Sequence, residues 1–122
     1  MGMWCRGIRG ATQVDANTSE AILAGTKELL QRMVDSNQID KESVACVLLT
    51  ATPDLNAEFP ALAARQLGWT DVALMCGQEM GVPHGLPRCI RILILYNTDK
   101  RPEEITHVYI RGAEGLREDA GK

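Results

Sequence analysis

Two charged residues interrupt or end apolar runs in the middle of the chain. Arg91 alone breaks the run from Cys89 to Leu95, and Glu79 follows the run from Val72 to Cys76. A charge at such a strand position is costly to bury unless a partner of opposite sign meets it. Arg91 therefore needs an anion. The two runs leave open whether that anion is a protein carboxylate, with Glu79 as one candidate, or a bound ligand.

A second arginine lies in the first apolar stretch, from Met3 to Thr12. Strand alternation places Arg9 on one face with the small residues Cys5, Gly7 and Ala11. A long cation among small neighbours could reach into a cavity. A solvated arginine on an edge strand fits the same pattern, so both interpretations of Arg9 stay open at this point.

The sequence contains no motif for covalent catalysis, since it has no G-x-S-x-G, no evident Ser-His-Asp arrangement and no glycine-rich phosphate loop. His84 is a general-base candidate by residue type, because histidine titrates near neutrality, but an exposed loop histidine is the simpler interpretation. The remaining polar set is Arg9, Arg91, Glu79 and Tyr109. Such a set binds an anion better than it transfers protons, so it suits a dianionic substrate that needs only electrostatic help.

The composition predicts one globular domain, residues 1–122. A chain of 122 residues that is 45% hydrophobic can bury a core without disulfides or metals. The net charge of −3 and the absence of a basic block argue against nucleic acid as a partner. The longest apolar run is too short to cross a membrane, and the first ten residues lack the apolar segment of a signal peptide.

The four cysteines are widely spaced and form no C-x-x-C pair. Each stands in an apolar run, which predicts small, free core residues in a reducing cytosol rather than disulfides. Two scattered histidines do not complete a tetrahedral zinc site with them, so no metal is expected.

The periodicity predicts an α+β domain with the element order strand, helix, strand, helix, strand, strand, strand. Two helices would cover one face of the sheet, and the other face would suit packing against copies of the chain. We expect Asn17 to cap the first helix, with Glu20 completing a capping box, and Phe59 to pack beside the second. The predicted elements are Met3–Thr12, a helix to about Ser36, Ser43–Thr50 as a central strand, Pro60–Leu67, Val72–Cys76, Cys89–Leu95 and Thr106–Arg111.

Five blocks of the sequence, in this order, carry a resemblance to a known family. They are RGIRGAT at 6–12, LLTATPDLNAEFPALAARQLGW at 48–69, CGQEM at 76–80, CIRI at 89–92 and HVY at 107–109. Each block is short, but their joint order and spacing are specific and run from Arg6 to Arg117. The chain resembles the small monofunctional bacterial chorismate mutases of the trimeric type.

The resemblance implies the Claisen rearrangement of chorismate to prephenate, at the branch toward phenylalanine and tyrosine, in the cytoplasm. It implies a mixed sheet with two helices on one face, assembled as a homotrimer with a barrel-like core of the Bacillus chorismate mutase type. The active sites would lie between subunits. It implies no cofactor, no metal and no covalent intermediate.

The resemblance also assigns catalytic roles to motif positions. Arg91 should reach the ether oxygen of the substrate, which gains negative charge as its bond breaks. Arg9 and Tyr109 should hold substrate carboxylate. Glu79 should accept a hydrogen bond from the ring hydroxyl and face the partly positive ring.

Further motif positions are implied as substrate-binding residues. Cys76 would join the same hydrogen-bond set through its backbone or its thiol. Phe59 would supply an apolar wall from the neighbouring subunit. Arg65, Leu116 and Arg117 would assist binding at the mouth of the site.

One departure from the family pattern concerns the second helix, where Leu62 stands at a position that is often lysine. A cation near the mouth is therefore missing. Two other functions stay open beside the mutase: an anion-binding or regulatory module with the same inter-subunit clefts, and a trimeric hydrolase of reactive imines, which rests on fold analogy alone.

Overall fold

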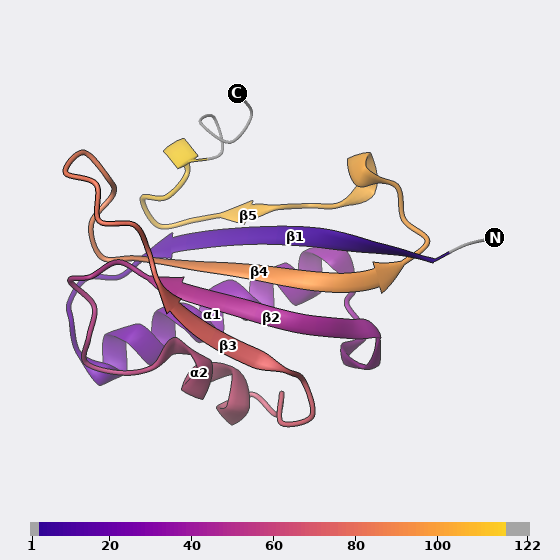
Figure 1. The fold of residues 1–122 in the computed structure, drawn as a ribbon, viewed down its shortest axis with the longest axis horizontal. Coiled ribbons are helices and arrows are strands. Elements are labelled where there is room, and N and C mark those ends of the chain that lie inside the picture. Colours follow the sequence, from indigo (N-terminus) through magenta and orange to yellow (C-terminus); the bar gives the residue numbers. More distant parts are fainter. Residues whose placement is uncertain (1–2, 117–122) are drawn as a thin grey trace.

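The predicted order of elements is confirmed in the computed structural model, which describes residues 3–116. A long helix and a short one alternate with the strands before three strands close the chain (Figure 1). The elements are β1 (Trp4–Gln13), α1 (Ser19–Asn37), β2 (Val44–Ala51), α2 (Pro60–Gln66), β3 (Leu74–Gln78), β4 (Cys89–Thr98) and β5 (Val108–Tyr109), with short 3-10 helices at Lys41–Ser43 and Pro102–Glu104.

The strands form one mixed sheet in the order β3-β2-β4-β1-β5 (Figure 1). β4 runs antiparallel to both β1 and β2, whereas the outer pairs, β1 with β5 and β2 with β3, are parallel. The α+β class with a mixed sheet is therefore confirmed. The segment from 43 to 50 is an internal strand, as predicted, because β3 pairs with the outer side of β2 and β4 with its inner side, and β4 lies in the middle of the sheet.

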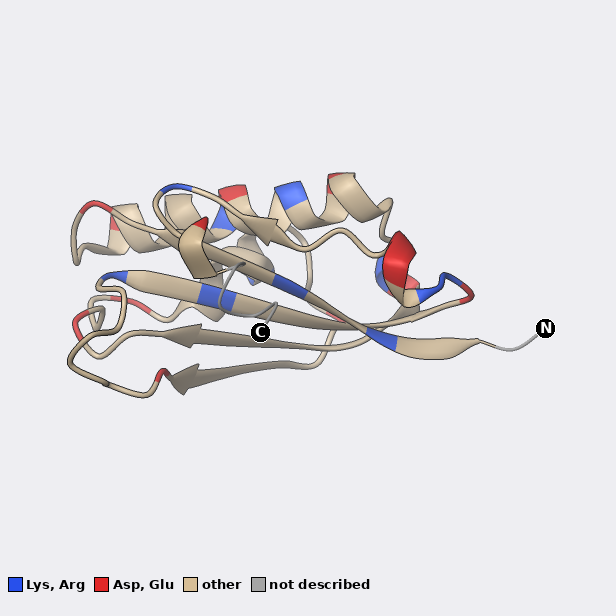
Figure 2. Ribbon diagram, turned by 90° about the horizontal axis from the view of Figure 1, so that it is seen from above, with Lys and Arg blue, Asp and Glu red and all other residues tan. Residues whose placement is uncertain are grey.

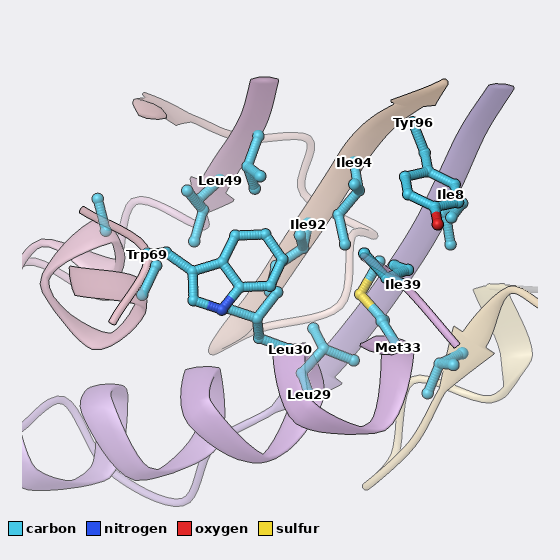
Figure 3. Packing of buried hydrophobic residues seen from close by; sticks show 14 residues of the cluster. Ile8, Leu29, Leu30, Met33, Ile39, Leu49, Trp69, Ile92, Ile94 and Tyr96 are labelled. Atoms are coloured by element: carbon cyan, nitrogen blue, oxygen red, sulfur yellow. The ribbon is translucent and has the colours of Figure 1, made fainter. Parts of the chain in front are cut away.

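Both helices lie on one face of the sheet (Figure 2). The core between them is aliphatic, as predicted, and Trp69 joins it (Figure 3). Truncation of one such buried side chain to alanine costs about 2–5 kcal/mol. Gly10 lets α1 approach β1 closely, since a Cβ there would lie 3.1 Å from Leu29 Cδ1. The labelled core residues are Ile8, Leu29, Leu30, Met33, Ile39, Leu49, Trp69, Ile92, Ile94 and Tyr96.

Over residues 3–116, neither α1 nor α2 covers the opposite face of the sheet (Figure 2). Leu48 on β2 and Leu93 and Leu95 on β4 are only half-buried there, and Met75 on β3 is 65% exposed. Leu93 pairs with Leu48, and Met75 also pairs with Leu48, so these side chains form one apolar patch. We call the patch of Leu48, Met75, Leu93 and Leu95 the open face.

Several local predictions are wrong in detail. Thr18 caps α1, with its hydroxyl accepting from the Ala21 N–H at 3.1 Å. Asn17 instead accepts from the Asn56 N–H at 3.0 Å, and so holds the loop before α2. Phe59 does not pack in this chain, because its side chain is 71% exposed.

The cysteines and the last strand also differ from expectation. All four cysteines are free, but only Cys89 is buried, while Cys5 is exposed and the other two are intermediate. β5 covers only Val108–Tyr109 and not Thr106–Arg111. Arg111 adopts a left-handed backbone with φ of +53°, which ends the extended conformation there.

Candidate active site

A row of paired residues crosses all five strands. Arg91 on β4 lies between Ala11 on β1 and Thr50 on β2. The row continues to Tyr109 beyond Ala11 and to Gly77 beyond Thr50. Because paired residues share a face, Ala11, Arg91 and Thr50 all point to the side of the sheet without helices. This row is the frame of the candidate site.

Arg91 and Glu79 meet at the end of β3. The Arg91 Nε lies 3.7 Å from Glu79 Oε2, and the two side chains are 46% and 26% exposed. The same carboxylate oxygen accepts a short hydrogen bond from the Thr50 hydroxyl, while the Glu79 N–H donates to the Ala51 carbonyl at 2.9 Å. The apolar neighbours of Arg91 in the sequence suggested a buried position, but its side chain is exposed to solvent. Its cation faces a fixed carboxylate and still stays open to an incoming anion.

Cys89 lies two residues before Arg91 and is 2% exposed. Burial raises the pKa of its thiol, and the neighbouring Arg91 guanidinium only partly offsets that shift. A thiol with a raised pKa is a poor nucleophile at neutral pH. His84 is exposed, as the simpler interpretation predicted. Beside Arg91 the arrangement therefore offers electrostatic stabilisation, and Cys89 is not an activated nucleophile.

Arg9 stands on the same face as Arg91. It pairs with Leu93, whereas Arg91 pairs with Ala11 two residues along β1. Diagonal neighbours of this kind lie roughly 7–8 Å apart, and their Cβ atoms are somewhat closer. The Arg9 N–H donates to His107 Nδ1 at 2.9 Å, which ties β1 to the segment before β5. Two exposed arginines thus occupy one face and can address two anionic groups of one ligand.

Tyr109 and Leu116 belong to one small cluster at the β5 side of the row. Buried Ala11, Cys89 and Ala113 form its centre, and Leu86, Tyr109 and Leu116 pack against them. Leu116 thus reaches the strand residues next to Arg91. Arg117, the other predicted contact of the C-terminal segment, lies outside the described residues.

The remaining predicted residues are not brought to Arg91 within this chain. Phe59 and Cys76 line a separate cavity of about 460 Å³ between the start of α2 and β3. The Cys76 side chain packs against the helix-side core, so its backbone alone is available to the open side of the sheet. Arg65 is exposed on α2. One chain therefore holds two separate parts of the predicted site.

Two polar contacts were missed by the sequence analysis. Thr50 orients Glu79, and His107 accepts from the Arg9 backbone. A signal for Thr50 did exist, because it is the polar residue that ends an apolar strand just as Glu79 follows another. His107 carried no such signal, since its contact depends on how β5 pairs with β1.

Within the part of the chain that the structure describes, no group of three or more His, Cys, Asp or Glu side chains is arranged to hold a metal ion. Over the same residues, no helix is both long and apolar enough to cross a membrane.

Comparison with known proteins identifies close relatives. The sequence model of the family described as chorismate mutase type I matches residues 5–120. "Chorismate mutase AroH" of Bacillus subtilis is 48% identical over 118 residues, which cover 96% of this chain and 93% of that protein. The Thermus thermophilus protein of the same name is 49% identical over 115 residues, or 93% and 94% of the two chains.

A solved structure agrees with these sequence relatives. The chorismate mutase from Clostridium thermocellum superimposes with a TM-score of 0.89 at 46% identity, and the match covers 91% of this chain and 99% of that one.

Proposed function

The chain belongs to the chorismate mutase type I family, and we propose that it works as a homotrimer whose active sites form between neighbouring copies. As a chorismate mutase, it is an isomerase of aromatic biosynthesis that converts chorismate to prephenate. No observation favours the binding module or the imine hydrolase.

The observation that carries the mechanism is the open charge of Arg91. The rearrangement is unimolecular: one C–O bond breaks while one C–C bond forms, so the ether oxygen gains negative charge in the transition state. Arg91 is fixed on the central strand and nearly half exposed. A cation held ready for charge that appears only in the transition state lowers the barrier by about 3–4 kcal/mol.

The other residues of the row hold the substrate in the reactive conformer. Arg9 and Tyr109 bind carboxylate, and the planar Arg9 fork suits that group. Glu79 accepts from the ring hydroxyl through the oxygen that the Thr50 hydroxyl does not occupy. Its negative charge also faces the partly positive ring of the transition state.

The second part of the site comes from a neighbouring copy. Phe59 is 71% exposed at the start of α2 and supplies the apolar wall. Arg65 of α2 assists binding at the mouth. In the chain that supplies Arg91, Leu116 borders the substrate and the Cys76 backbone joins the hydrogen bonds beside Glu79. Arg117 keeps its proposed role in substrate binding. Leu62 leaves the mouth without the additional cation.

The open face supports the trimer, because half-buried leucines and a 65% exposed methionine would otherwise meet water. Copies that place these faces together would form the barrel-like core. Four free thiols and the aromatic pathway fit a cytoplasmic enzyme.

One experiment tests the chemistry. Purified protein is mixed with chorismate, the loss of its ultraviolet absorbance is followed, and prephenate is identified at the end. Conversion that is abolished in Arg91→Ala supports Arg91 as the catalytic cation. Unchanged turnover in that variant, with the fold intact, contradicts it.

A second experiment tests the shared site. Arg91→Ala and Phe59→Asp chains are refolded together after each has been found inactive as a trimer. If the two residues come from different copies, some sites in mixed trimers contain neither substitution, and activity returns. Mixed trimers that stay inactive contradict a site built from two chains.

A further inference from the structure

A strained turn follows β5 and is held by a paired arginine. Arg111 has φ of +53° and Gly112 has φ of +94°. The left-handed conformation is uncommon and strained for a residue with a side chain. The Arg111 guanidinium donates from Nε and Nη2 to the two carboxylate oxygens of Glu28 on α1, at 2.8 and 2.7 Å. This two-bond contact fixes the backbone of the turn against the helix.

The same turn touches two other segments near the site. A Cβ at Gly112 would collide with the Gln13 side chain at the end of β1. Gln13 Nε2 in turn donates to the Pro87 carbonyl, just before β4, at 2.9 Å. The Gly112 N–H donates to Glu114 Oε1 at 2.8 Å. The conformation of the turn is thus fixed by contacts with α1 and with Gln13 of β1, and Gln13 is itself held by the loop before β4.

Beyond the turn the chain packs next to Arg91. Ala113 is fully buried with Ala11, the strand partner of Arg91, and with Cys89, two residues before it. The Leu116 N–H donates to the Ala113 carbonyl at 3.1 Å, and the Leu116 side chain joins the same cluster. The position of Leu116 next to Ala11, the strand partner of Arg91, therefore depends on the backbone direction that the turn at Arg111 and Gly112 gives to the following residues.

We propose that Glu28 and Arg111 are positioning residues, which fix the segment from Ala113 to Leu116 where it borders the substrate. Neither is a catalytic residue, because α1 lies on the face of the sheet opposite the one to which Arg91 points (Figure 2). This inference rests on the proposed function, in which Leu116 contacts the ligand. The new element is that the Glu28–Arg111 ion pair, on the helix-covered face of the sheet, affects substrate affinity on the opposite face, to which Arg91 points.

The test uses the full-length enzyme with Glu28→Gln and Arg111→Ala, measured for chorismate turnover. The expected result is a KM raised about threefold to tenfold with kcat within about twofold, because the pair is partly solvated and its loss moves the segment without altering Arg91. Arg111→Lys should recover little of the affinity, since a lysine keeps the charge but not the two-bond geometry.

The matched control is Glu103→Gln. Glu103 also pairs with an arginine, at 2.8 Å from Arg101 Nη2, and the substitution removes the same charge. It should leave both constants unchanged. A KM rise of equal size in this control would overturn the inference, because net charge alone would then explain the effect.

A double variant separates the positioning role from a general loss of structure. If Glu28 acts through Leu116, the KM increase of Glu28→Gln with Leu116→Ala is smaller than the product of the two single increases. Multiplicative effects, or a fall in kcat without a change in KM, would overturn the inference. If Leu116→Ala alone leaves KM unchanged, then the proposed contact of Leu116 with substrate fails as well, which distinguishes the two failures.

Discussion

Two arginine–glutamate pairs in this chain show how the same residue types serve different ends. Arg111 and Glu28 are joined by two hydrogen bonds of 2.8 and 2.7 Å. Arg91 and Glu79 lie 3.7 Å apart, beyond hydrogen-bond distance, and one oxygen of Glu79 is occupied by the Thr50 hydroxyl. We call the first pair complete, because the guanidinium of Arg111 makes two hydrogen bonds to Glu28. We call the second pair incomplete, because Arg91 makes no hydrogen bond to Glu79 at 3.7 Å.

The difference reflects where each pair is placed. Arg111 sits in a turn whose backbone strain needs a fixed partner, so satisfying the guanidinium stabilises the turn. Arg91 sits on a central strand, where regular pairing with β1 and β2 already fixes the backbone. Its guanidinium is free to be used on a ligand. An arginine that is paired by two hydrogen bonds within the protein, such as Arg111, stabilises the local structure. An arginine on a rigid strand that is incompletely paired, such as Arg91, is available for catalysis.

The largest effect is expected from breaking the incomplete pair. Arg91→Ala should lower kcat by about 10²–10³-fold or more, as loss of a transition-state charge partner does, with substrate binding retained in part. Arg91→Lys should also fail, because the lysine lacks the planar fork. Chorismate turnover and ligand affinity, measured side by side, check this result.

A matched change in the complete pair provides the contrast. Arg111→Ala removes the same side chain and should change KM and not kcat. If the two alanine variants lowered kcat equally, the distinction between a catalytic and a positioning arginine would be lost.

The second largest effect concerns the turn that the complete pair stabilises. Gly112→Ala should destabilise the protein by about 1–3 kcal/mol, because φ of +94° disfavours a side chain and the new Cβ would displace Gln13. Gly115→Ala is the control, since a Cβ there meets nothing within 4 Å. Denaturant unfolding of both variants checks the prediction. Equal stability of the two would contradict the strain argument.

The fold was predictable because its elements are locally encoded. Alternation along 4–13 and helical spacing along 19–37 hold in the structure to within about two residues. The strand order was not encoded locally. β5 was predicted longer than it is, because nothing in the segment from 106 to 111 indicates that Arg111 turns to a left-handed conformation to meet Glu28, 83 positions earlier.

The residues of the candidate site likewise fall into those that a local sequence pattern indicates and those that it does not. Arg91 and Glu79 were found from the sequence because a charge in an apolar strand is conspicuous in a single run of residues. Thr50 and His107 were missed, because their contacts depend on strand pairing and on side-chain direction. Phe59 and Cys76 face a cavity away from Arg91 in one chain. The proposed role of Phe59 therefore requires a neighbouring copy of the chain, which no local pattern encodes.

A third prediction sharpens the account of the incomplete pair. Thr50→Val keeps the shape of the side chain but removes the hydroxyl that holds Glu79 Oε2. Glu79 should then move toward Arg91 and complete the pair, which would lower kcat by roughly 10-fold to 10²-fold, in line with the loss of one hydrogen bond to a charged group. Thr70→Val, at an exposed position, is the control for the substitution itself. A Thr50→Val enzyme with unchanged kcat would show that Glu79 needs no second partner.

The smallest expected effect is the pH dependence of the complete pair. The Arg111 hydrogen bonds, opposed by partial burial, hold the pKa of the Glu28 carboxyl below its ordinary value of 4.5. A carboxyl with a lowered folded-state pKa adds stability that is fully present above the unfolded-state value and is lost as the pH falls through the folded-state value.

The difference in unfolding free energy between wild type and Glu28→Gln should therefore be constant near neutrality and shrink as the pH falls below about 4.5. Asp54 also has a lowered pKa, mainly through the Thr52 hydroxyl, but it is present in both proteins and cancels in the difference. Denaturant unfolding at several pH values measures that difference. If this difference in unfolding free energy instead increased toward acid pH, the prediction would be wrong. Such an increase would mean that the folded protein favours the protonated Glu28 carboxyl, whereas two hydrogen bonds from a guanidinium favour the carboxylate.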